Sequence, residues 1–107
     1  MPKCKVSILT PAWRDIDRIS DYHLMMVGAE SAERITDKLL DTIAQLAEFP
    51  WMGAEHPDPV LAQNHYRKVL CGEYVCVYRV IEDTVFIYRV VHGATDYTKY
   101  FNRIPIF

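Results

Sequence analysis

The sequence contains no apolar run that approaches the ~18 residues of a membrane-spanning helix, because charged and polar residues interrupt every candidate. Its opening stretch, MPKCKVSILTP, lacks the long apolar segment and small-residue cleavage site of a secretory signal peptide. Its 3 cysteines, Cys4, Cys71 and Cys76, are odd in number and have no metal-ligand spacing. We therefore expect a cytoplasmic protein with reduced thiols, no membrane association and no cofactor.

The sequence also lacks a dense positive charge, since its formal net charge is −2. Residues 1–65 carry 6 basic and 10 acidic side chains, and residues 66–107 carry 6 and 4. The mildly basic second half falls far short of a typical nucleic-acid-binding surface. His56, Asp58 and His65 lie close together in sequence, but their spacing matches no standard metal motif, so we expect no metal site.

A chain of 107 residues with 50% apolar and 24% charged residues is typical of one globular domain, here residues 1–107. It contains no internal repeat and no low-complexity segment. A domain of this size buries roughly two-thirds of its unfolded surface, which is enough for one modest core. We expect a partner to stabilise such a domain measurably.

The first predicted helix begins at Thr10, which we place at the N-cap, with Pro11 at the first helical position. Apolar residues then recur every three or four positions, as on one face of a helix. Asp15 and Asp17 lie in the first turns, where acidic side chains favour the helix dipole. Gly28 ends this helix.

The second predicted helix has the clearest apolar periodicity in the sequence and ends before Pro50. Its stripe consists of Ala32, Ile35, Leu39, Ile43 and Leu46. The short glycine-containing link between the two helices predicts an antiparallel hairpin. Residues 50–64 are rich in proline and polar residues, and we interpret them as a loop of about fifteen residues, long enough to be functional or mobile.

The remaining chain is rich in predicted strands separated by short turns. We place strands at 5–9, 66–70, 74–81 and 85–92, with a helical turn near 97–101. The order predicts an α+β fold, in which an N-terminal strand is followed by an antiparallel helical hairpin packed on a small twisted antiparallel β-sheet.

Two-residue turns at 71–72 and 82–83 would place Arg67 opposite Cys76, and Cys76 opposite Arg89. Side chains alternate between the faces of a strand, so this register groups several residues on one face. That face would hold Arg67, Tyr74, Cys76, Tyr78 and Arg89, and the other face Arg79, Tyr88 and His92. The alternative is an amphipathic sheet whose arginine stems lie along apolar neighbours with their heads in water.

The ordered segments ILTPAWRDIDRISDY, AERITDKLLDTIAQLAEFPWMG, YRKVLCGEYVCVYRV and VFIYRVVHGATDY resemble the RelE/ParE superfamily of bacterial toxins. The resemblance extends from about Val6 to Phe101. It implies a type II toxin–antitoxin (plasmid stabilisation) module and the fold described above.

One branch of this superfamily, the RelE-like toxins, consists of metal-independent, ribosome-dependent mRNA endoribonucleases. Resemblance to that branch implies Arg67, His92 and Tyr100 as catalytic residues. The loop AEHPDPVLAQNH contains no lysine or arginine where that branch usually has lysines, and Ala94 occupies the place of an expected basic residue. An acidic protein is also a poor match for a ribosomal RNA target.

The other branch, the ParE-like toxins, inhibits DNA gyrase by binding it, without catalysis. The run Arg89-Val90-Val91-His92-Gly93, followed by Asp96, resembles the end of a strand in that branch, although Ala94 and Thr95 depart from its usual arginines. We favour this branch. The implied target-binding residues are Arg67, Tyr78, Arg89, His92 and Tyr97. A structural role is open for His92, whose side chain could instead bond to the chain at the strand end.

Resemblance to either branch implies a cognate antitoxin as partner, in a toxin–antitoxin hetero-oligomer. Small cores with exposed apolar strips gain from added burial. The candidate antitoxin-binding residues are Trp13, Met25, Met26 and Trp51. A third hypothesis is a non-toxic, antitoxin-binding interaction domain.

Overall fold

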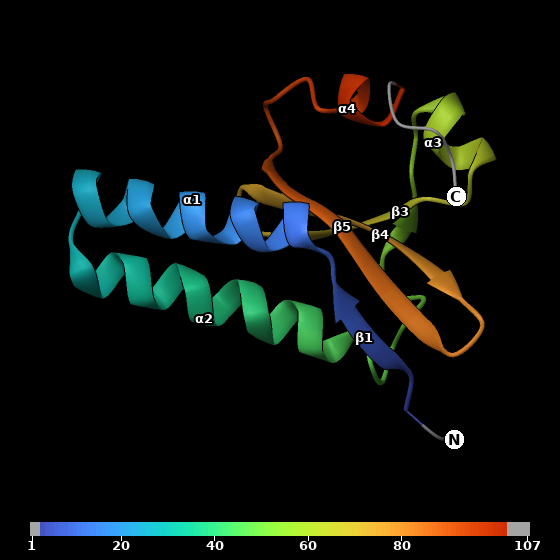
Figure 1. Cartoon of the computed structure of the whole chain (residues 1–107), viewed down its shortest axis with the longest axis horizontal. Helices are drawn as coiled ribbons and strands as arrows, with labels where there is room; N and C mark the ends of the chain where they lie inside the picture. The colour runs from blue at the N-terminus through green and yellow to red at the C-terminus, as the bar shows by residue number, and fades with distance from the viewer. Residues whose placement is uncertain (1–2, 103–107) are drawn as a thin grey trace.

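The computed structural model describes residues 3–102, apart from the side chain of Asn102, and confirms the predicted α+β fold (Figure 1). A hairpin of two long helices lies on one side of a sheet with the strand order β1-β5-β4-β3-β2. The elements are β1 (Lys5–Ile8), α1 (Thr10–Met26), α2 (Ala29–Gln45), β2 (Ala54–Glu55), α3 (Pro59–Gln63), β3 (Arg67–Cys71), β4 (Tyr74–Ile81), β5 (Thr84–His92) and α4 (Thr98–Asn102).

The predicted antiparallel strands form a meander of β3, β4 and β5. β1 joins the edge of this meander in parallel with β5 and pairs only with Thr84 to Ile87. The second half of β5 therefore extends beyond β1. Helix α1, which follows β1 directly, covers the edge that β1 leaves open.

The predicted N-cap at Thr10 is wrong, because Thr10 is already the first helical residue and Leu9 occupies the N-cap. The backbone N–H of Leu9 still donates to the carbonyl of Ile87 at 3.1 Å, so the chain passes from sheet to helix without a polar capping residue. The predicted end of α1 is confirmed, since Gly28 separates α1 from α2 with a φ of 144°. Glycine is favoured there because it lacks a Cβ.

The predicted loop at 50–64 contains two short elements, β2 and α3. Asp58 caps α3, because its Oδ1 accepts hydrogen bonds from the backbone N–H groups of Val60 at 2.9 Å and Leu61 at 3.2 Å. Pro59 follows as the first helical residue, where its missing N–H is no loss. The dipeptide Asp58-Pro59 is typical of a helix start, but the proline-rich composition of the segment favoured a loop.

The register predicted for the first turn is wrong by two residues. Cys71 pairs with Tyr74, and Arg67 therefore lies opposite Tyr78 rather than Cys76. The turn is formed by residues 72–73, with Gly72 in the left-handed region at a φ of 59°, as the first position of a tight hairpin favours. A shift of two residues keeps every side chain on its predicted face.

The second turn has the predicted register, but a bulge next to Tyr78 shifts the remainder of the pairing by one residue. Arg89 therefore lies opposite Val77, not opposite Cys76 as predicted. Because side chains alternate between the two faces of a strand, a one-residue shift puts a side chain on the opposite face from its predicted neighbours. Arg89 thus leaves the face that Arg67 and Tyr78 share, and the predicted two-arginine face does not form.

Two apolar clusters lie on opposite faces of the sheet. The helix-covered cluster includes Ala12, Ile16, Leu39, Ile43, Leu46, Cys76, Tyr78, Val85, Ile87 and Val90. The opposite cluster, which includes residues of α3 and α4, consists of Leu61, Tyr66, Val75, Val77, Val91, Tyr97 and Phe101. The free thiol of Cys76 lies in the first cluster, where burial raises its pKa to about 12. Within residues 3–102, no helix is long and apolar enough to cross a membrane.

Candidate functional site

The open half of the β5 edge borders a groove of about 530 Å³ between α1 and the segment that precedes and enters α4. One wall comes from α1, the floor from the end of β5 and the start of β4, and the other wall from residues of the 93–102 segment. The polar and aromatic lining residues include Asp15, Arg18, Tyr22, His23, Glu73, Tyr74, Arg89, His92 and Tyr100. We call this hollow the α1–β5 groove.

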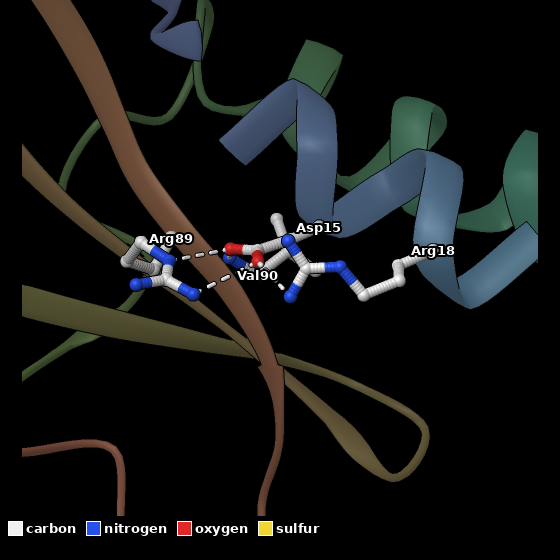
Figure 2. Close-up of polar contacts among 4 residues, drawn as sticks. All are labelled: Asp15, Arg18, Arg89 and Val90. Carbon is white, nitrogen blue, oxygen red and sulfur yellow. Dashed lines mark hydrogen bonds and ion pairs between the residues drawn. The ribbon is translucent and has the colours of Figure 1, made fainter. Parts of the chain in front are cut away.

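A buried ion pair joins α1 to β5 at this groove (Figure 2). Arg89 donates from Nε to Asp15 Oδ2 at 2.7 Å and from Nη2 to Asp15 Oδ1 at 2.9 Å. The backbone N–H of Val90 donates to the same Oδ2 at 2.9 Å. Asp15 is only 4% exposed, and a buried carboxylate needs partners in place of water. A bidentate contact with the guanidinium and a backbone N–H donor supply them.

The Asp15 carboxylate also determines how much of Arg89 is available to a ligand. The hydrogen bonds that Arg89 donates to Asp15 raise the pKa of the guanidinium, although partial burial acts in the other direction. The guanidinium carbon lies 4.6 Å from the ring centre of Tyr100, on the opposite wall. Arg89 is therefore fixed between a carboxylate and an aromatic ring, with its charge largely neutralised inside the protein.

Arg18 is the exposed cation of the groove. Its side chain is 72% exposed, and its Nη1 lies 4.0 Å from Asp15 Oδ1, which Arg89 already occupies (Figure 2). Such a long contact between an exposed side chain and a carboxylate that is already paired contributes little to stability. Arg18 is thus free to pair with an acidic group that enters the groove.

Two histidines line the groove near Tyr74. His23 bonds through Nε2 to the Tyr74 hydroxyl at 3.0 Å and through Nδ1 to the Ser31 hydroxyl at 3.0 Å. The His92 ring packs edge-on to Tyr74 at 5.6 Å between centres. Burial, followed by the negative charge of Glu73, raises the pKa of the Tyr74 hydroxyl, which therefore stays protonated at neutral pH.

His92 makes a hydrogen bond to the chain at the end of the strand, the contact that its structural role would require. Its Nδ1 accepts a hydrogen bond from the backbone N–H of Ala94 at 3.1 Å, just after the chain turns at Gly93. Its Nε2 lies 3.6 Å from Glu73 Oε2, on the turn between β3 and β4. The side chain nevertheless remains half-exposed on the groove rim.

Arg67 and Tyr78 lie away from the groove, near the other edge of the sheet. Arg67 donates to the carbonyls of Trp51 and Gly53, and its guanidinium stacks 5.1 Å from the Trp51 ring centre. Tyr78 is fully buried, and its hydroxyl donates to the carbonyl of Pro50 at 2.9 Å. Both side chains hold the 50–53 loop in place.

The structure therefore brings some predicted site residues together and separates others. Arg89, His92 and Tyr100 line one groove, but Arg67 does not join them. Tyr97 is buried on the opposite face of the sheet, where His56 contacts its hydroxyl at 2.8 Å. The candidate catalytic residues and the candidate target-binding residues are therefore each divided between the groove and other parts of the sheet.

The four candidate antitoxin-binding residues are all exposed, at three places. Trp13 lies near the start of α1, and Met25 and Met26 lie at its far end, next to the hairpin tip. Trp51 lies beside a second hollow of about 720 Å³ formed mainly by residues 47–52. Their exposure leaves them available to a partner.

Sequence reasoning missed the importance of Asp15, because it predicts only a favourable interaction of this carboxylate with the helix dipole. The available signal was spacing, because Asp15 lies three residues after Ala12 and four before Ile19, both on the apolar side of α1. A charged residue at such a position requires a buried partner. Its partner Arg89 is 74 residues away, so the sequence could not identify it.

A match to a family model defines the class of protein, the toxins of type II toxin–antitoxin systems. A family model described as "ParE toxin of type II toxin-antitoxin system, parDE" matches residues 6–97. The chain belongs to the ParE toxin family of the RelE/ParE superfamily, on the branch that the sequence favoured.

Solved structures of the same fold include members of both branches. The ParDE system of P. aeruginosa matches with a TM-score of 0.73 and 19% identity over 86% of this chain and 98% of the other. The RelBE2 complex of Mycobacterium tuberculosis matches with a TM-score of 0.64 and 22% identity over 84% of this chain and 98% of the other. A free mutant of E. coli RelE matches with a TM-score of 0.62 and 17% identity over 96% of this chain and 99% of the other. Comparison with curated protein sequences finds no significant match. Identities this low support the fold alone.

Proposed function

We propose that this toxin inhibits DNA gyrase by binding, without catalysis, and acts in the cytoplasm until a cognate antitoxin neutralises it. Membership of the ParE family supports this assignment. We further propose that the α1–β5 groove takes part in target binding, with Arg18 on its rim and Arg89, His92 and Tyr100 within it.

The observation that carries the proposal is the engagement of Arg89 by Asp15. Metal-independent RNA cleavage requires an available cation at the phosphate together with a positioned acid and base. Here the guanidinium of Arg89 already neutralises a buried carboxylate, and Arg67 lies with Trp51 at a different part of the sheet. This division favours a binding surface over a catalytic site.

Ribosome-dependent RNA cleavage is the second candidate, because His92 and Tyr100 line the same groove. An imidazole and a phenol that line one groove are groups able to donate and accept protons. This function would need Arg67 or Arg18 to supply the phosphate contact. The experiment below separates the two candidates by the process that stops first.

We propose that the antitoxin covers the exposed apolar residues Trp13, Met25, Met26 and Trp51, giving a toxin–antitoxin hetero-oligomer. Solved relatives from ParDE and RelBE systems support an antitoxin partner. Methionine and tryptophan suit such a surface because they bury large apolar areas and adapt to their neighbours. The module would then stabilise the plasmid or chromosome that encodes it.

The test is to express the protein without its antitoxin in a bacterial host and to pulse-label DNA and protein synthesis separately. Gyrase inhibition predicts that DNA synthesis falls first and that the purified protein blocks supercoiling by gyrase. Arg18→Glu should weaken both effects at least tenfold, because it reverses the charge of the groove rim. Antitoxin co-expression should abolish them.

Arg34→Glu is the matched control, because its side chain is equally exposed at 72% but lies on α2. It should retain full inhibition, and circular dichroism should show that both variants fold. An initial loss of translation would replace gyrase with the ribosome as target. No effect on growth, in soluble folded protein, would favour the non-toxic interaction domain.

A further inference from the structure

Residues 93–102 link the α1–β5 groove to the opposite face of the sheet. Thr95 and Tyr100 line the groove, whereas Tyr97 and Phe101 are buried against the sheet. The two pairs alternate along one short segment. The position of this groove wall therefore depends on how Tyr97 and Phe101 are held.

His56 is the polar anchor of Tyr97. The imidazole is 3% exposed and lies edge-on to the Tyr97 ring, with 5.6 Å between the ring centres. Its Nδ1 accepts a hydrogen bond from the backbone N–H of Asp58 at 3.1 Å. Because Nδ1 is an acceptor, the neutral ring carries its proton on Nε2 and donates it to the Tyr97 hydroxyl at 2.8 Å.

The groups around His56 oppose its protonation. Burial lowers the pKa of the imidazole, and the positive charge of Lys68 on β3 lowers it further. The Asp58 carboxylate acts in the other direction, but it already accepts two backbone hydrogen bonds in capping α3. Burial and Asp58 also raise the pKa of the Tyr97 hydroxyl, so that group stays protonated.

We propose that the hydrogen bond from His56 to Tyr97 is a pH-sensitive latch that holds this wall of the groove. A proton added from solvent must bind at Nδ1, because Nε2 already carries one. The imidazolium would then present an N–H group to the backbone N–H of Asp58, and the two donors repel. The ring must leave its site to find acceptors, and the Tyr97 hydroxyl loses its partner.

Opening is expected to be local. Among the described side chains of the segment, Tyr97 and Phe101 are the two that belong to the apolar cluster, whereas β4 is paired on both sides with β3 and β5. Segments with few buried contacts open at lower free energy than the core. Acid should therefore loosen 93–102, and with it the groove, while the sheet stays intact. This device does not depend on the identity of the toxin's target.

Amide hydrogen exchange of the free toxin at pH 7.5 and pH 5.5 tests the latch directly. The reporters are the N–H groups of Thr95, Tyr97 and Tyr100, which donate to carbonyls within or next to the segment. After correction for the intrinsic effect of pH, their protection should fall about tenfold at the lower pH, as expected for the loss of one buried hydrogen bond. Protection of β4 amides should not change.

Tyr97→Phe removes the latch but keeps the buried ring. In this variant, protection of the same amides should be low at both pH values and nearly independent of pH. His65→Asn is the control, because His65 is exposed and its φ of 67° suits asparagine. It should behave like the wild type.

His92 is the rival sensor, because its Nδ1 accepts from the Ala94 N–H at the base of the segment and its Nε2 approaches Glu73. His92→Asn should keep the pH response if His56 is the sensor. The proposal is overturned if the response persists in Tyr97→Phe, if His92→Asn abolishes it, or if the wild type shows no response.

Discussion

Arg89 and Arg79 lie on neighbouring strands and are both largely withdrawn from water, yet the protein accommodates them differently. Arg89, next to α1, forms a two-pronged pair with the buried carboxylate of Asp15. Arg79, on β4, is 7% exposed and lies about equally far from the centres of two tyrosine rings, Tyr66 at 4.9 Å and Tyr88 at 5.0 Å.

The surroundings of Arg79 contain aromatic and neutral polar groups. Its Nε and Nη2 donate to the Tyr88 hydroxyl at 3.0 Å and 2.6 Å, and its Nη1 approaches the carbonyl of Asn64 at 3.4 Å. Among residues 3–102, no carboxylate forms a salt bridge with it. Electron-rich ring faces and a hydroxyl oxygen thus stabilise the cation in place of an anion.

This difference has a consequence for stability. Removing one member of a buried ion pair leaves a full opposite charge without compensation, whereas removing a neutral partner leaves only an unsatisfied donor. Stability should therefore be far more sensitive to the loss of the partner of Arg89 than to the loss of the partner of Arg79. Arg89 also joins two elements distant in sequence, while Arg79 and Tyr88 belong to adjacent strands.

The largest expected effect comes from Asp15→Ala, which leaves Arg89 and the Val90 N–H without their shared acceptor. The free energy of unfolding should fall by about 3–5 kcal/mol. Urea unfolding measures this change, with Asp17→Ala on the exposed side of the same helix as the control. Adding Arg89→Met to Asp15→Ala should recover part of the loss, because it removes the uncompensated charge. A cost below about 1 kcal/mol would show that the pair is not an important link.

A smaller effect is expected from Tyr88→Phe, which keeps the ring over Arg79 but removes the hydroxyl that accepts two of its hydrogen bonds. We expect a loss of about 2 kcal/mol, since hydrogen bonds to charged groups are stronger than neutral ones. Tyr22→Phe is the control, because Tyr22 is exposed and should change stability by less than about 0.5 kcal/mol. If Tyr88→Phe cost as much as Asp15→Ala, the contrast between the two arginines would be wrong.

The sequence predicted the elements better than the contacts between them. The apolar stripe of α2 was readable because periodicity records which side of a helix is buried. The strand 74–81 was readable because a run rich in apolar residues lies between two short turns. Turn residues, by contrast, only suggested the register. The bulge beside Tyr78 has no local sequence signature, and it alone moved Arg89 away from its predicted neighbours.

The candidate site was only partly predictable for the same reason. Two of its residues, His92 at the end of β5 and Tyr100, were implied by the resemblance to the toxin superfamily. The ion pair of Asp15 with Arg89 and the bond of His56 with Tyr97 join residues 74 and 41 positions apart. Such pairs depend on tertiary packing, and a single sequence contains no local pattern that specifies them.

The smallest expected effect is a loss of stability in acid that originates on the side of the sheet opposite the helices. Burial, and then the charge of Lys68, lowers the pKa of His56 below its ordinary value of 6.5. As the pH falls below about 6.5, the unfolded chain binds a proton before the folded protein does, so the free energy of unfolding decreases. The contribution of this one proton cannot exceed about 1.4 kcal/mol per pH unit. It is fully present above about pH 6.5 and is lost as the pH falls towards the folded pKa.

Urea unfolding of the wild type, His56→Gln and His65→Asn between pH 5 and pH 8 isolates this contribution. The wild type and His65→Asn should lose stability in parallel below about pH 6.5, because the exposed His65 lies outside the clusters. His56→Gln should be less stable at pH 8 but should lose less on acidification, since it removes the buried imidazole. Parallel curves for all three proteins would mean that acid acts elsewhere, and the surroundings of His56 would then be no more sensitive to pH than the α1–β5 groove held by Asp15 and Arg89.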